Sequence, residues 1–412
     1  MKTIVSVFLY VIICSIQIYA VSAEEINLNA KAAVIMDAES GKILYEKSKD
    51  QKMPNASTTK ILTCLYILKH CDLDQMAEVS KNAAMQPKVR LGVREGEKYK
   101  VKDLLYGLML ESYNDCAVVL AEHAEGSVEK FEKRMNQMAE NLGTLNTHFV
   151  TPNGLDGIDK KGRHETTAQD LAKIMARCIK NQQFLEITQT KQYTFTDGSR
   201  KRRFICNNHN ALLSSMQGVI SGKTGYTSKA GYCYVGAVKQ KNMTMTFSVL
   251  ASGWPPHKTY KWKDVRKLVQ YATDHYERRE IIADTSKIKE ISIKNGLKEK
   301  VLLKTGNLKA AFLVKKTDKI KIVIPSGTAI QNARTSFIGD HLNRDGYHLD
   351  VKIGRYTAAC TWFERIFKHN VVGNPYAPEG LDEARKAVAQ KAAHAAVKHP
   401  YKVTELSITN EQ

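Results

Sequence analysis

The stretch Met53-Pro54-Asn55-Ala56-Ser57-Thr58-Thr59-Lys60 leads into an apolar run that continues to His70. Apolar residues at positions 61, 62, 65, 67 and 68 predict a helix over residues 57–70 with a buried start. Ser57 and Lys60 then share one helix face, one turn apart. A serine hydroxyl is a poor nucleophile until a base takes its proton, and a lysine can be that base if burial and nearby positive charge lower its pKa. This spacing predicts Ser57 as a nucleophile and Lys60 as its base.

Two further motifs follow along the chain, Ser112-Tyr113-Asn114 and Lys223-Thr224-Gly225. In the first, the serine can relay a proton and the asparagine can hold a substrate amide. In the second, on a strand edge, the lysine can attract a carboxylate, the threonine can add a hydrogen bond and the glycine lets a substrate backbone lie along the strand. The N–H groups of the helix start at Ser57 can hold an oxyanion. Together the motifs predict acyl transfer through a serine.

Each motif is short, and only its context separates it from other copies. Ser-x-x-Lys recurs at Ser127 and Ser286, and Lys-Thr-Gly recurs at Lys304. Ser127 lies among charged residues on a predicted solvated helix face, Ser286 lies in a charged linker, and Lys304 ends a predicted outer strand. Ser57 alone among these serines begins a buried helix, so we expect the reactive serine there.

The surrounding pattern predicts one mixed domain over residues 24–280. Strands are expected at 32–38, 42–46, 219–220, 231–239 and 243–252, and helices at 101–110, 117–124, 130–142, 167–180 and 262–277. Strands at both ends and helices between them indicate an α+β fold, a sheet packed against helices. Short alternating strands predict a small β-domain over 281–324. Residues 325–412 are nearly neutral and helix-forming.

The N-terminus predicts export. An apolar run from Ile4 to Ala20 precedes Val21-Ser22-Ala23, the pattern of a secretory signal over residues 1–23 that is cut after Ala23. An uncleaved membrane anchor is the alternative, since the run approaches spanning length. The chain would then act at the outer face of the cytoplasmic membrane, in the cell wall or in the periplasm.

The composition is that of a globular protein: 412 residues, 43% hydrophobic and 25% charged, enough for two or three domains. The net charge is +20, and the last 88 residues hold only 11 basic against 9 acidic residues, so +18 lies before them. Such a charge suits a polyanion. Because export argues against nucleic acid, we expect an anionic cell-wall polymer or membrane surface as partner.

The eight cysteines are scattered, and several, such as Cys64 and Cys116, lie in apolar stretches. Removal of the signal would leave seven, an odd number, which favours small core residues over a disulfide framework. No Cys-x-x-Cys pair is present, so a zinc ribbon is not expected. We expect neither a metal nor a cofactor.

The three motifs in this order resemble the penicillin-binding and serine β-lactamase superfamily. The flanking stretches narrow the resemblance to the low-molecular-weight D-alanyl-D-alanine carboxypeptidases, and they lie at 53–60, 147–156, 164–172, 208–213 and 223–232. The resemblance covers roughly residues 30–281 and, more weakly, the β-domain to about 320. It implies a transpeptidase-like domain with a central antiparallel sheet and a helical subdomain.

This resemblance also implies a reaction and further site residues. A peptidoglycan stem peptide would acylate Ser57, terminal D-alanine would leave, and the acyl-enzyme would be hydrolysed, with β-lactams as covalent inhibitors. By position, Tyr226 would supply the second oxyanion N–H, and Thr227 would belong to the same substrate site. Relatives often place an arginine after the last core strand to bind the substrate carboxylate. Here that region reads Lys258-Thr259-Tyr260-Lys261-Trp262-Lys263, so the residue in that role is open.

Four alternatives remain at this point. A serine β-lactamase would need a carboxylate that activates the deacylating water, and no matching Glu-x-x-Leu-Asn is found. A catalytically inert penicillin-binding protein is the second alternative. Residues 218–224 nearly spell a phosphate-binding loop, but three residues rather than four separate its glycines. His164-Glu165 resembles half of a zinc-protease motif, but position 168 is not histidine.

The last segment does not resemble the carboxypeptidases, which usually end in an amphipathic membrane-binding helix. The stretches 323–334 and 344–349 are instead similar to the C-terminal part of an SGNH-type hydrolase, in which Asp-x-x-His supplies two triad members. Asp345 and His348 have that spacing, but the Gly-Asp-Ser-type block that would carry the serine is absent. We interpret residues 325–412 as a fused fragment and the β-domain before it as truncated. A live second hydrolase that borrows a serine elsewhere is the alternative.

Overall fold

The computed structural model describes residues 26–282, 291–292, 300–301, 309–318, 324–345 and 348–406. The chain divides into two units, Met1–Tyr276 and Glu277–Gln412, and each is described by itself. The predicted signal, Ser286 and Lys304 lie outside the described residues.

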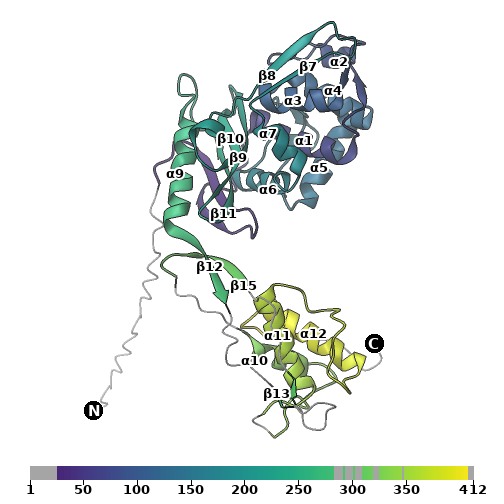
Figure 1. Ribbon diagram of the computed structural model, residues 1–412, viewed down its shortest axis with the longest axis vertical. Helices are drawn as coiled ribbons and strands as arrows, with labels where there is room; N and C mark the ends of the chain where they lie inside the picture. Colours follow the sequence, from purple (N-terminus) through teal and green to yellow (C-terminus); the bar gives the residue numbers. More distant parts are fainter. Residues whose placement is uncertain are drawn as a thin grey trace, which may run out of the picture. The chain divides into compact units, whose positions relative to one another are not determined.

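A five-stranded antiparallel sheet is the frame of the first unit (Figure 1). Its order is β2-β1-β11-β10-β9, with bounds Ile43–Lys47, Ala32–Asp37, Met243–Leu250, Gly231–Gln240 and Val219–Thr227. β1 pairs with β11, so the two ends of the domain lie side by side in the sheet. Every residue of β1 is buried, because helices cover both faces of the sheet. The predicted mixed domain with a central antiparallel sheet is confirmed.

The helix α9, Tyr260–His275, covers the outer face of this sheet (Figure 1). Its buried Asp264 carboxylate accepts hydrogen bonds from the backbone N–H groups of Asn29 and Ala30, at 2.9 and 2.8 Å, and from the Ser252 hydroxyl at 2.6 Å. A buried carboxylate needs such partners because its desolvation is costly. Asp264 therefore ties the closing helix to the start of β1 and the end of β11.

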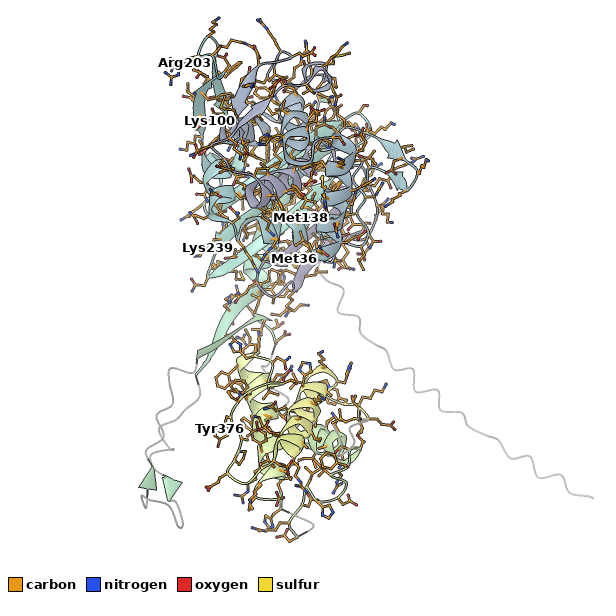
Figure 2. The ribbon with its side chains drawn as sticks, turned by 90° about the vertical axis from the view of Figure 1, so that its right-hand side faces the viewer. Met36, Lys100, Met138, Arg203, Lys239 and Tyr376 are labelled. Carbon is orange, nitrogen blue, oxygen red and sulfur yellow. The ribbon has the colours of Figure 1, made fainter. Side chains whose placement is uncertain are left out.

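Helices gather on the other face of the sheet and extend into a helical lobe (Figure 1). They are α1 Lys60–His70, α2 Lys81–Ala84, α3 Val101–Tyr106, α4 Asn114–Glu125, α5 Val128–Asn141, α6 Ala168–Cys178, α7 Gln182–Gln189 and α8 Leu212–Ser215. α6 packs on the sheet itself and against α1. Outward-facing basic side chains are spread over the unit: Lys100, Arg203 and Lys239 are all exposed (Figure 2).

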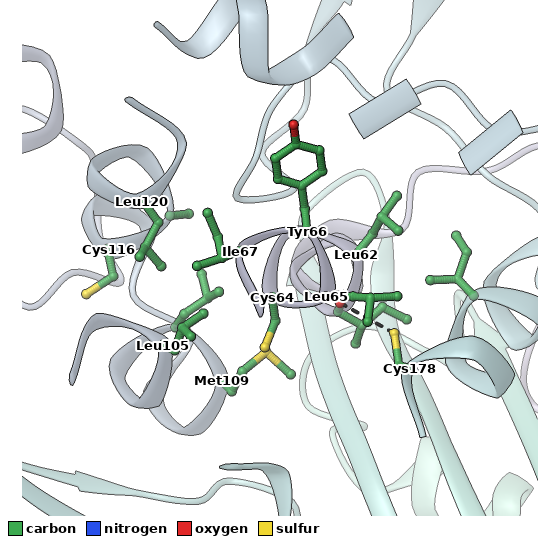
Figure 3. Close-up of a cluster of buried hydrophobic side chains, with 14 of the residues drawn as sticks. Leu62, Cys64, Leu65, Tyr66, Ile67, Leu105, Met109, Cys116, Leu120 and Cys178 are labelled. Carbon is green, nitrogen blue, oxygen red and sulfur yellow. Dashed lines mark hydrogen bonds between the residues drawn. The ribbon is translucent and has the colours of Figure 1, made fainter. Parts of the chain in front are cut away.

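α1 runs through the middle of the hydrophobic core and is buried from Lys60 to Ile67 (Figure 3). Around it lie apolar side chains from the neighbouring helices, including Leu105, Met109 and Leu120. Complete burial of one leucine or isoleucine contributes about 1.5–3 kcal/mol. This packing holds α1 rigidly and allows one amine, that of Lys60, to be buried with it.

Short hairpins complete the first unit, and the sequence pattern did not predict them. They pair β3 Met76–Glu78 with β4 Lys98–Lys100, β5 Ile158–Asp159 with β6 Gly162–Arg163, and β7 Gln192–Thr196 with β8 Arg203–Asn207. Strands of two to five residues carry too little alternation to stand out.

The predicted helix over 57–70 differs from the structure at its start. Residues Ala56–Thr59 form a 3₁₀ turn, and the α-helix begins only at Lys60. The Asn55 amide donates to the hydroxyls of Thr58 and Thr59, at 3.1 and 2.8 Å, which fastens the turn. Ala56 has φ +49°, in the left-handed region that is uncommon for residues other than glycine. The chain thus turns sharply just before Ser57.

In its described residues, the second unit holds short strands and then three helices. β12 Tyr276–Ile282 pairs with β15 Lys309–Lys315, and β13 Ile291–Ser292 pairs with β14 Lys300–Val301. α10 Ser326–Arg334, α11 Ile353–Phe367 and α12 Glu383–Lys398 enclose a separate small core. The predicted helix-forming character of residues 325–412 is confirmed. Most of the predicted β-domain lies outside the described residues.

All seven described cysteines are free, and six of them are buried, as the core interpretation predicts. Within the described ranges, no group of histidine, cysteine and carboxylate side chains could hold a metal ion. Among the helices of that same part of the chain, none combines the length and the apolar character needed to cross a membrane.

Candidate active site

Ser57 lies where the edge strand β9 meets the 3₁₀ turn that precedes α1. The Nζ atom of Lys60 is 2.8 Å from the Ser57 Oγ atom, so the predicted pairing one turn apart is present in the structure. Lys60 is fully buried. Burial, reinforced by the nearby charge of Lys223, holds the pKa of Lys60 well below its ordinary value.

The surroundings of Lys60 orient its lone pair. Two atoms that can only accept hydrogen bonds lie beside Nζ: Asn114 Oδ1 at 2.9 Å and the Asn153 carbonyl at 2.6 Å. The Asn114 Nδ2 group donates to the Pro87 carbonyl at 3.2 Å, which assigns the oxygen of this amide to Lys60. A neutral amine has two hydrogens, and these acceptors take both. Its lone pair is then left for the Ser57 hydroxyl, the arrangement that a general base requires.

Two glycines let other segments approach the Ser57 backbone. A Cβ atom on Gly225 of β9 would lie 2.9 Å from the Ser57 nitrogen. Gly154 has φ +83°, and a Cβ atom there would collide with the Ala56 carbonyl. The sequence predicts that Gly225 makes room for a substrate backbone, but its missing side chain faces the Ser57 turn. Its role in the structure is to permit close packing of β9 against the nucleophile.

β9 is the last strand of the sheet, so one of its edges is open. Tyr226 faces Tyr232 in β10, and the Tyr232 N–H turns away to the Gly253 carbonyl at 2.9 Å. In an antiparallel pair that exchanges no hydrogen bonds, both N–H groups point away from each other. The Tyr226 N–H therefore points to the open edge, where the predicted second oxyanion donor is needed.

Lys223 is buried on β9, and its Nζ atom donates to the Thr224 carbonyl at 2.9 Å. Burial lowers the pKa of Lys223 to about 7. A carboxylate bound beside it would favour the charged form. Thr224 lines the cleft, with Tyr226 next to it.

Ser112 follows a π-helical turn, Gly107–Glu111, and has φ +68°. Such turns often occur at functional sites. Its Oγ atom is buried and has no hydrogen-bond partner among the described residues, so no bond joins it to Ser57 or Lys60 there. An unsatisfied buried hydroxyl is unusual, and a substrate group could satisfy it. The predicted proton relay through Ser112 stays a prediction.

Two predicted substrate contacts are otherwise engaged. The Asn114 oxygen holds Lys60, as described above, rather than a substrate amide. The Thr227 hydroxyl accepts from the Ala230 N–H at 3.1 Å and points to Asp156 at 3.4 Å, in the turn between β9 and β10. In the structure Asn114 therefore positions the base and Thr227 closes a local turn, and their contacts with substrate stay predictions.

A cleft of about 560 Å³ opens in front of Ser57. Its lining joins the Ser57 turn, the residues around Ser112, the open edge of β9 and the start of α9: Ser57, Val89, Leu110, Glu111, Ser112, His209, Ala211, Thr224, Gly225, Tyr226, Tyr232, Lys258, Thr259, Lys261 and Trp262. The cleft therefore brings together parts of all three motifs.

Lys261 lies in the region that the sequence left open for a carboxylate-binding cation. Its Nζ atom lies 4.6 Å from the ring centres of both Tyr232 and Trp262 and donates to the Lys258 carbonyl at 2.5 Å. Burial lowers its pKa to about 8. Aromatic faces hold a cation in place. Lys261 thus puts a second ammonium group at the wall of the cleft, in the region that lacks the arginine.

Three further residues shape the site and were not predicted to belong to it. Asn153 and Gly154 contact Lys60 and Ala56 from a loop about 90 residues away in sequence. Asp115 accepts from the N–H groups of Leu91 and Gly92, at 2.9 and 2.7 Å, and so holds the loop beside the cleft. The Thr-Pro-Asn-Gly turn could have marked the first two, since it lies in a stretch that resembles the family.

The rejected copies have local roles in the structure. Ser127 caps α5 by accepting from the backbone N–H of Lys130 at 3.2 Å, so it faces a peptide group and not an amine. Residues 219–227 form the continuous strand β9. A phosphate-binding loop needs a glycine-rich turn before a helix, and this strand excludes it.

In the second unit, Asp345 and His348 contact each other, with His348 Nδ1 at 3.0 and 2.9 Å from the two carboxylate oxygens. Asp345 also accepts from the His348 N–H at 2.8 Å, which makes the pair part of a surface turn. His348 is 68% exposed at its side chain. Within the described residues no hydrogen bond joins it to a serine; Ser336 donates to the Ala333 carbonyl instead.

A serine paired with a buried lysine, beside an edge strand with Lys-Thr-Gly, defines a serine acyl-transfer enzyme with a penicillin-binding type of fold. A family model described as D-alanyl-D-alanine carboxypeptidase matches residues 19–253, more than half of the chain. The chain belongs to this family and is a serine-type peptidase.

Individual relatives agree. The D-alanyl-D-alanine carboxypeptidase DacF of Bacillus subtilis is 30% identical over 304 residues, which cover 73% of this chain and 76% of the relative. A crystal structure of a D-alanyl-D-alanine carboxypeptidase from Mycobacterium tuberculosis superposes with a TM-score of 0.56 at 29% identity, over 62% of this chain and 94% of the other. A mutant of the Streptomyces K15 DD-transpeptidase superposes with a TM-score of 0.56 at 32% sequence identity. The match covers 60% of this chain and 98% of the other.

The C-terminal part matches a different family. A model described only as a domain of unknown function matches residues 261–396. This match does not test the similarity to an SGNH-type hydrolase, which stays a prediction.

Proposed function

We propose that this serine D-alanyl-D-alanine carboxypeptidase removes the terminal D-alanine of peptidoglycan stem peptides through an acyl-enzyme on Ser57. The observation that carries the proposal is the orientation of Lys60. Two acceptors bind the hydrogens of the neutral amine, so its lone pair faces the Ser57 hydroxyl. The lowered pKa of Lys60 favours this neutral form.

In the proposed reaction, Ser57 Oγ attacks the carbonyl of the D-Ala-D-Ala bond while Lys60 takes the hydroxyl proton. The N–H groups of Ser57 and Tyr226 stabilise the oxyanion that develops. The peptide C–N bond then breaks, and the proton passes to the leaving amine through the Ser112 hydroxyl, which restores the neutral lysine. Water attacks the ester in the same way and releases the shortened peptide.

The substrate carboxylate would lie between Lys261, which lines the cleft, and Lys223, which is buried on β9 next to the lining residue Thr224. Lys223 and Thr224 meet it from the β9 edge, and Lys261 supplies the charge that an arginine gives in relatives. Two partly desolvated ammonium groups suit one carboxylate, because charge-assisted hydrogen bonds strengthen away from water. This pairing favours substrates that end in a free carboxylate and so supports carboxypeptidase action over endopeptidase action.

β-Lactams carry a carboxylate and a strained amide and would acylate the same serine. Because no Glu-x-x-Leu-Asn motif is found, we expect slow deacylation and therefore inhibition rather than β-lactamase turnover. Labelling of the purified protein with a fluorescent penicillin, followed by peptide mapping, tests the site. D-Alanine release from a stem pentapeptide, measured beside it, separates the enzyme from an inert penicillin-binding protein.

We expect Lys223→Ala to reduce turnover of D-Ala-D-Ala peptides by ~10²-fold or more, since one such contact stabilises a transition state by a few kcal/mol. Lys304→Ala is the matched control in the second Lys-Thr-Gly and should leave turnover unchanged. Peptide turnover is measured for both variants at substrate concentrations below KM. Equal losses would show that the wrong Lys-Thr-Gly was chosen.

The same lysine predicts an alkaline limb in the pH profile. Its pKa is about 7, and only the charged form attracts a carboxylate. The value of kcat/KM should therefore fall as pH rises above about 7, and this limb should be absent in Lys223→Ala.

We further propose that the protein is exported and acts at the outer face of the cytoplasmic membrane, in the cell wall or in the periplasm. The predicted signal over residues 1–23 supports export. The charge of +18 in the first 324 residues and the exposed Lys100, Arg203 and Lys239 support contact with an anionic wall polymer or lipid surface (Figure 2). Nucleic acid is not proposed as a partner.

We expect the C-terminal pair to have no part in this reaction. His348→Ala should leave D-alanine release unchanged, because Lys60 is the base of the carboxypeptidase site and a histidine base needs a nucleophile within hydrogen-bond reach. Ester hydrolysis by the penicillin-saturated wild type, measured beside the variant, is the test. Residual turnover that is lost only in His348→Ala would show a second active site in residues 325–412.

A further inference from the structure

His164 is a buried histidine outside the catalytic motifs, and all of its ring nitrogens are engaged. His164 comes directly after β6, and it is only 3% exposed. Nδ1 accepts from the backbone N–H groups of Val150 and Thr151, at 2.9 and 3.2 Å. Nε2 lies 2.8 Å from the Thr59 hydroxyl oxygen. One imidazole thus joins a distant loop to the turn that carries Ser57.

These partners determine the tautomer. Two backbone donors face Nδ1, so that atom carries no hydrogen, and Nε2–H donates to Thr59. The Thr59 hydroxyl donates its own hydrogen bond to the Ala56 carbonyl at 2.9 Å. Burial, reinforced by electrostatic interaction with His148 and Lys60, lowers the pKa of His164 to about 3. The ring is therefore neutral at physiological pH.

The loop that His164 holds is the one that contacts Lys60. The Thr151 hydroxyl accepts from the Gly154 N–H at 3.1 Å and donates to the Leu155 carbonyl at 3.0 Å, which closes the loop on itself. The carbonyl of Asn153, at the tip, accepts from Lys60 Nζ at 2.6 Å. The position of this acceptor thus depends on the amides that His164 fixes.

We propose that His164 is a positioning residue for acylation, which acts through the Asn153 carbonyl on the base Lys60. If that carbonyl moves away, one hydrogen of the neutral amine loses its acceptor. That N–H can then turn toward Ser57 Oγ, and the lone pair no longer faces the serine proton. The inference rests on the proposed function, since it concerns acylation of Ser57.

Three variants test it. His164→Phe keeps a ring that can pack against Phe149 and removes all three hydrogen bonds of the imidazole. His164→Asn places an amide oxygen near the position of Nδ1 and restores only the acceptor for the loop. His148→Asn is the matched control, because the His148 ring contacts Asp159 on the exposed hairpin and not the loop amides.

The readout is the second-order rate constant of penicillin acylation per active molecule, with the active fraction taken from the final labelling stoichiometry. We expect His164→Phe to lower this rate roughly 10–100-fold, since a displacement of about 1 Å in a catalytic group can cost 10²-fold. His164→Asn should recover to within roughly five-fold of wild type, and His148→Asn should match wild type. A purely structural role would reduce the stoichiometry and leave the rate per active molecule unchanged.

The inference is overturned if His164→Phe acylates at the wild-type rate, or if His164→Asn is as slow as His164→Phe. If His164→Phe does not fold, Thr59→Val and its combination with His164→Asn replace it. Both changes break the same Nε2 bond, so their effects on the rate should be less than additive. Full additivity would contradict the proposal. Absence of labelling in the wild type would instead reject the proposed function, and this outcome differs from a slow rate that is confined to the His164 variants.

Discussion

Ser57→Ala is expected to abolish covalent penicillin labelling and to reduce D-alanine release to background. The variant removes the only atom that Lys60 can activate, since the other contacts of its amine are the oxygens of Asn114 and Asn153. The loss of one methyl-sized hydroxyl should not disturb the fold, because the turn is fastened by Asn55, Thr58 and Thr59. Fluorescent penicillin on a denaturing gel measures the label, and circular dichroism checks the fold.

Ser127→Ala is the control for this experiment. It removes the serine of a second Ser-x-x-Lys, which caps α5 and faces no amine. We expect full labelling, with a loss of helix stability of about 1 kcal/mol from the missing cap. Labelling that survives in Ser57→Ala, or that disappears in Ser127→Ala, would place the nucleophile elsewhere.

Lys60→Met is expected to slow penicillin acylation by ~10²–10⁴-fold, the range that a general base contributes. Methionine fills the buried channel at similar length but cannot accept a proton. Ser57 stays in place, so a small residual rate should remain, in contrast to Ser57→Ala. Stopped-flow or timed gel labelling gives the rate constant, and Lys130→Met, on the exposed face of α5, should equal wild type.

The pH dependence gives a second check on the same lysine. The lowered pKa of Lys60 means that its basic form is already populated well below pH 10. Acylation should therefore fall as pH decreases through this lowered pKa, because protonation removes the lone pair. A wild-type rate that keeps rising up to pH 10 would show that Lys60 has an ordinary pKa and is not the base.

Burial of Lys60 lowers the stability of the fold, and we interpret its placement as a requirement of function. A fully buried lysine that forms no salt bridge with a described carboxylate is unfavourable unless it is neutral and hydrogen-bonded. The structure meets this requirement with the oxygens of Asn114 and Asn153. Departures from simple burial rules are expected at functional sites. The unsatisfied hydroxyl of Ser112 and the positive φ of Ala56 are further departures beside the same serine.

The C-terminal unit raises a separate question. It has its own small core, formed by α10, α11 and α12, and a family model described only as a domain of unknown function matches residues 261–396. The carboxypeptidase site is contained in the first unit, as the lining of the cleft is.

The sequence by itself determined those parts of the site that lie within one local element. Ser57 and Lys60 could be paired because three residues separate them, and one turn of chain brings such residues together in a 3₁₀ turn or an α-helix alike. The sheet could be predicted because its long strands are buried and bounded by turns. The strand expected at 219–220 covers only the start of β9, which continues through Lys223 to Thr227.

Only the tertiary structure decided the contacts that cross the chain. Asn153 reaches Lys60 over 93 residues, and His164 reaches Thr59 over 105. No periodicity records such pairs, since they arise when the packed sheet and helices bring distant loops together. For the same reason only the tertiary fold shows that Asn114 contacts the base and that Gly225 faces the turn of the nucleophile. Their neighbours in space, and not in sequence, determine what their atoms contact.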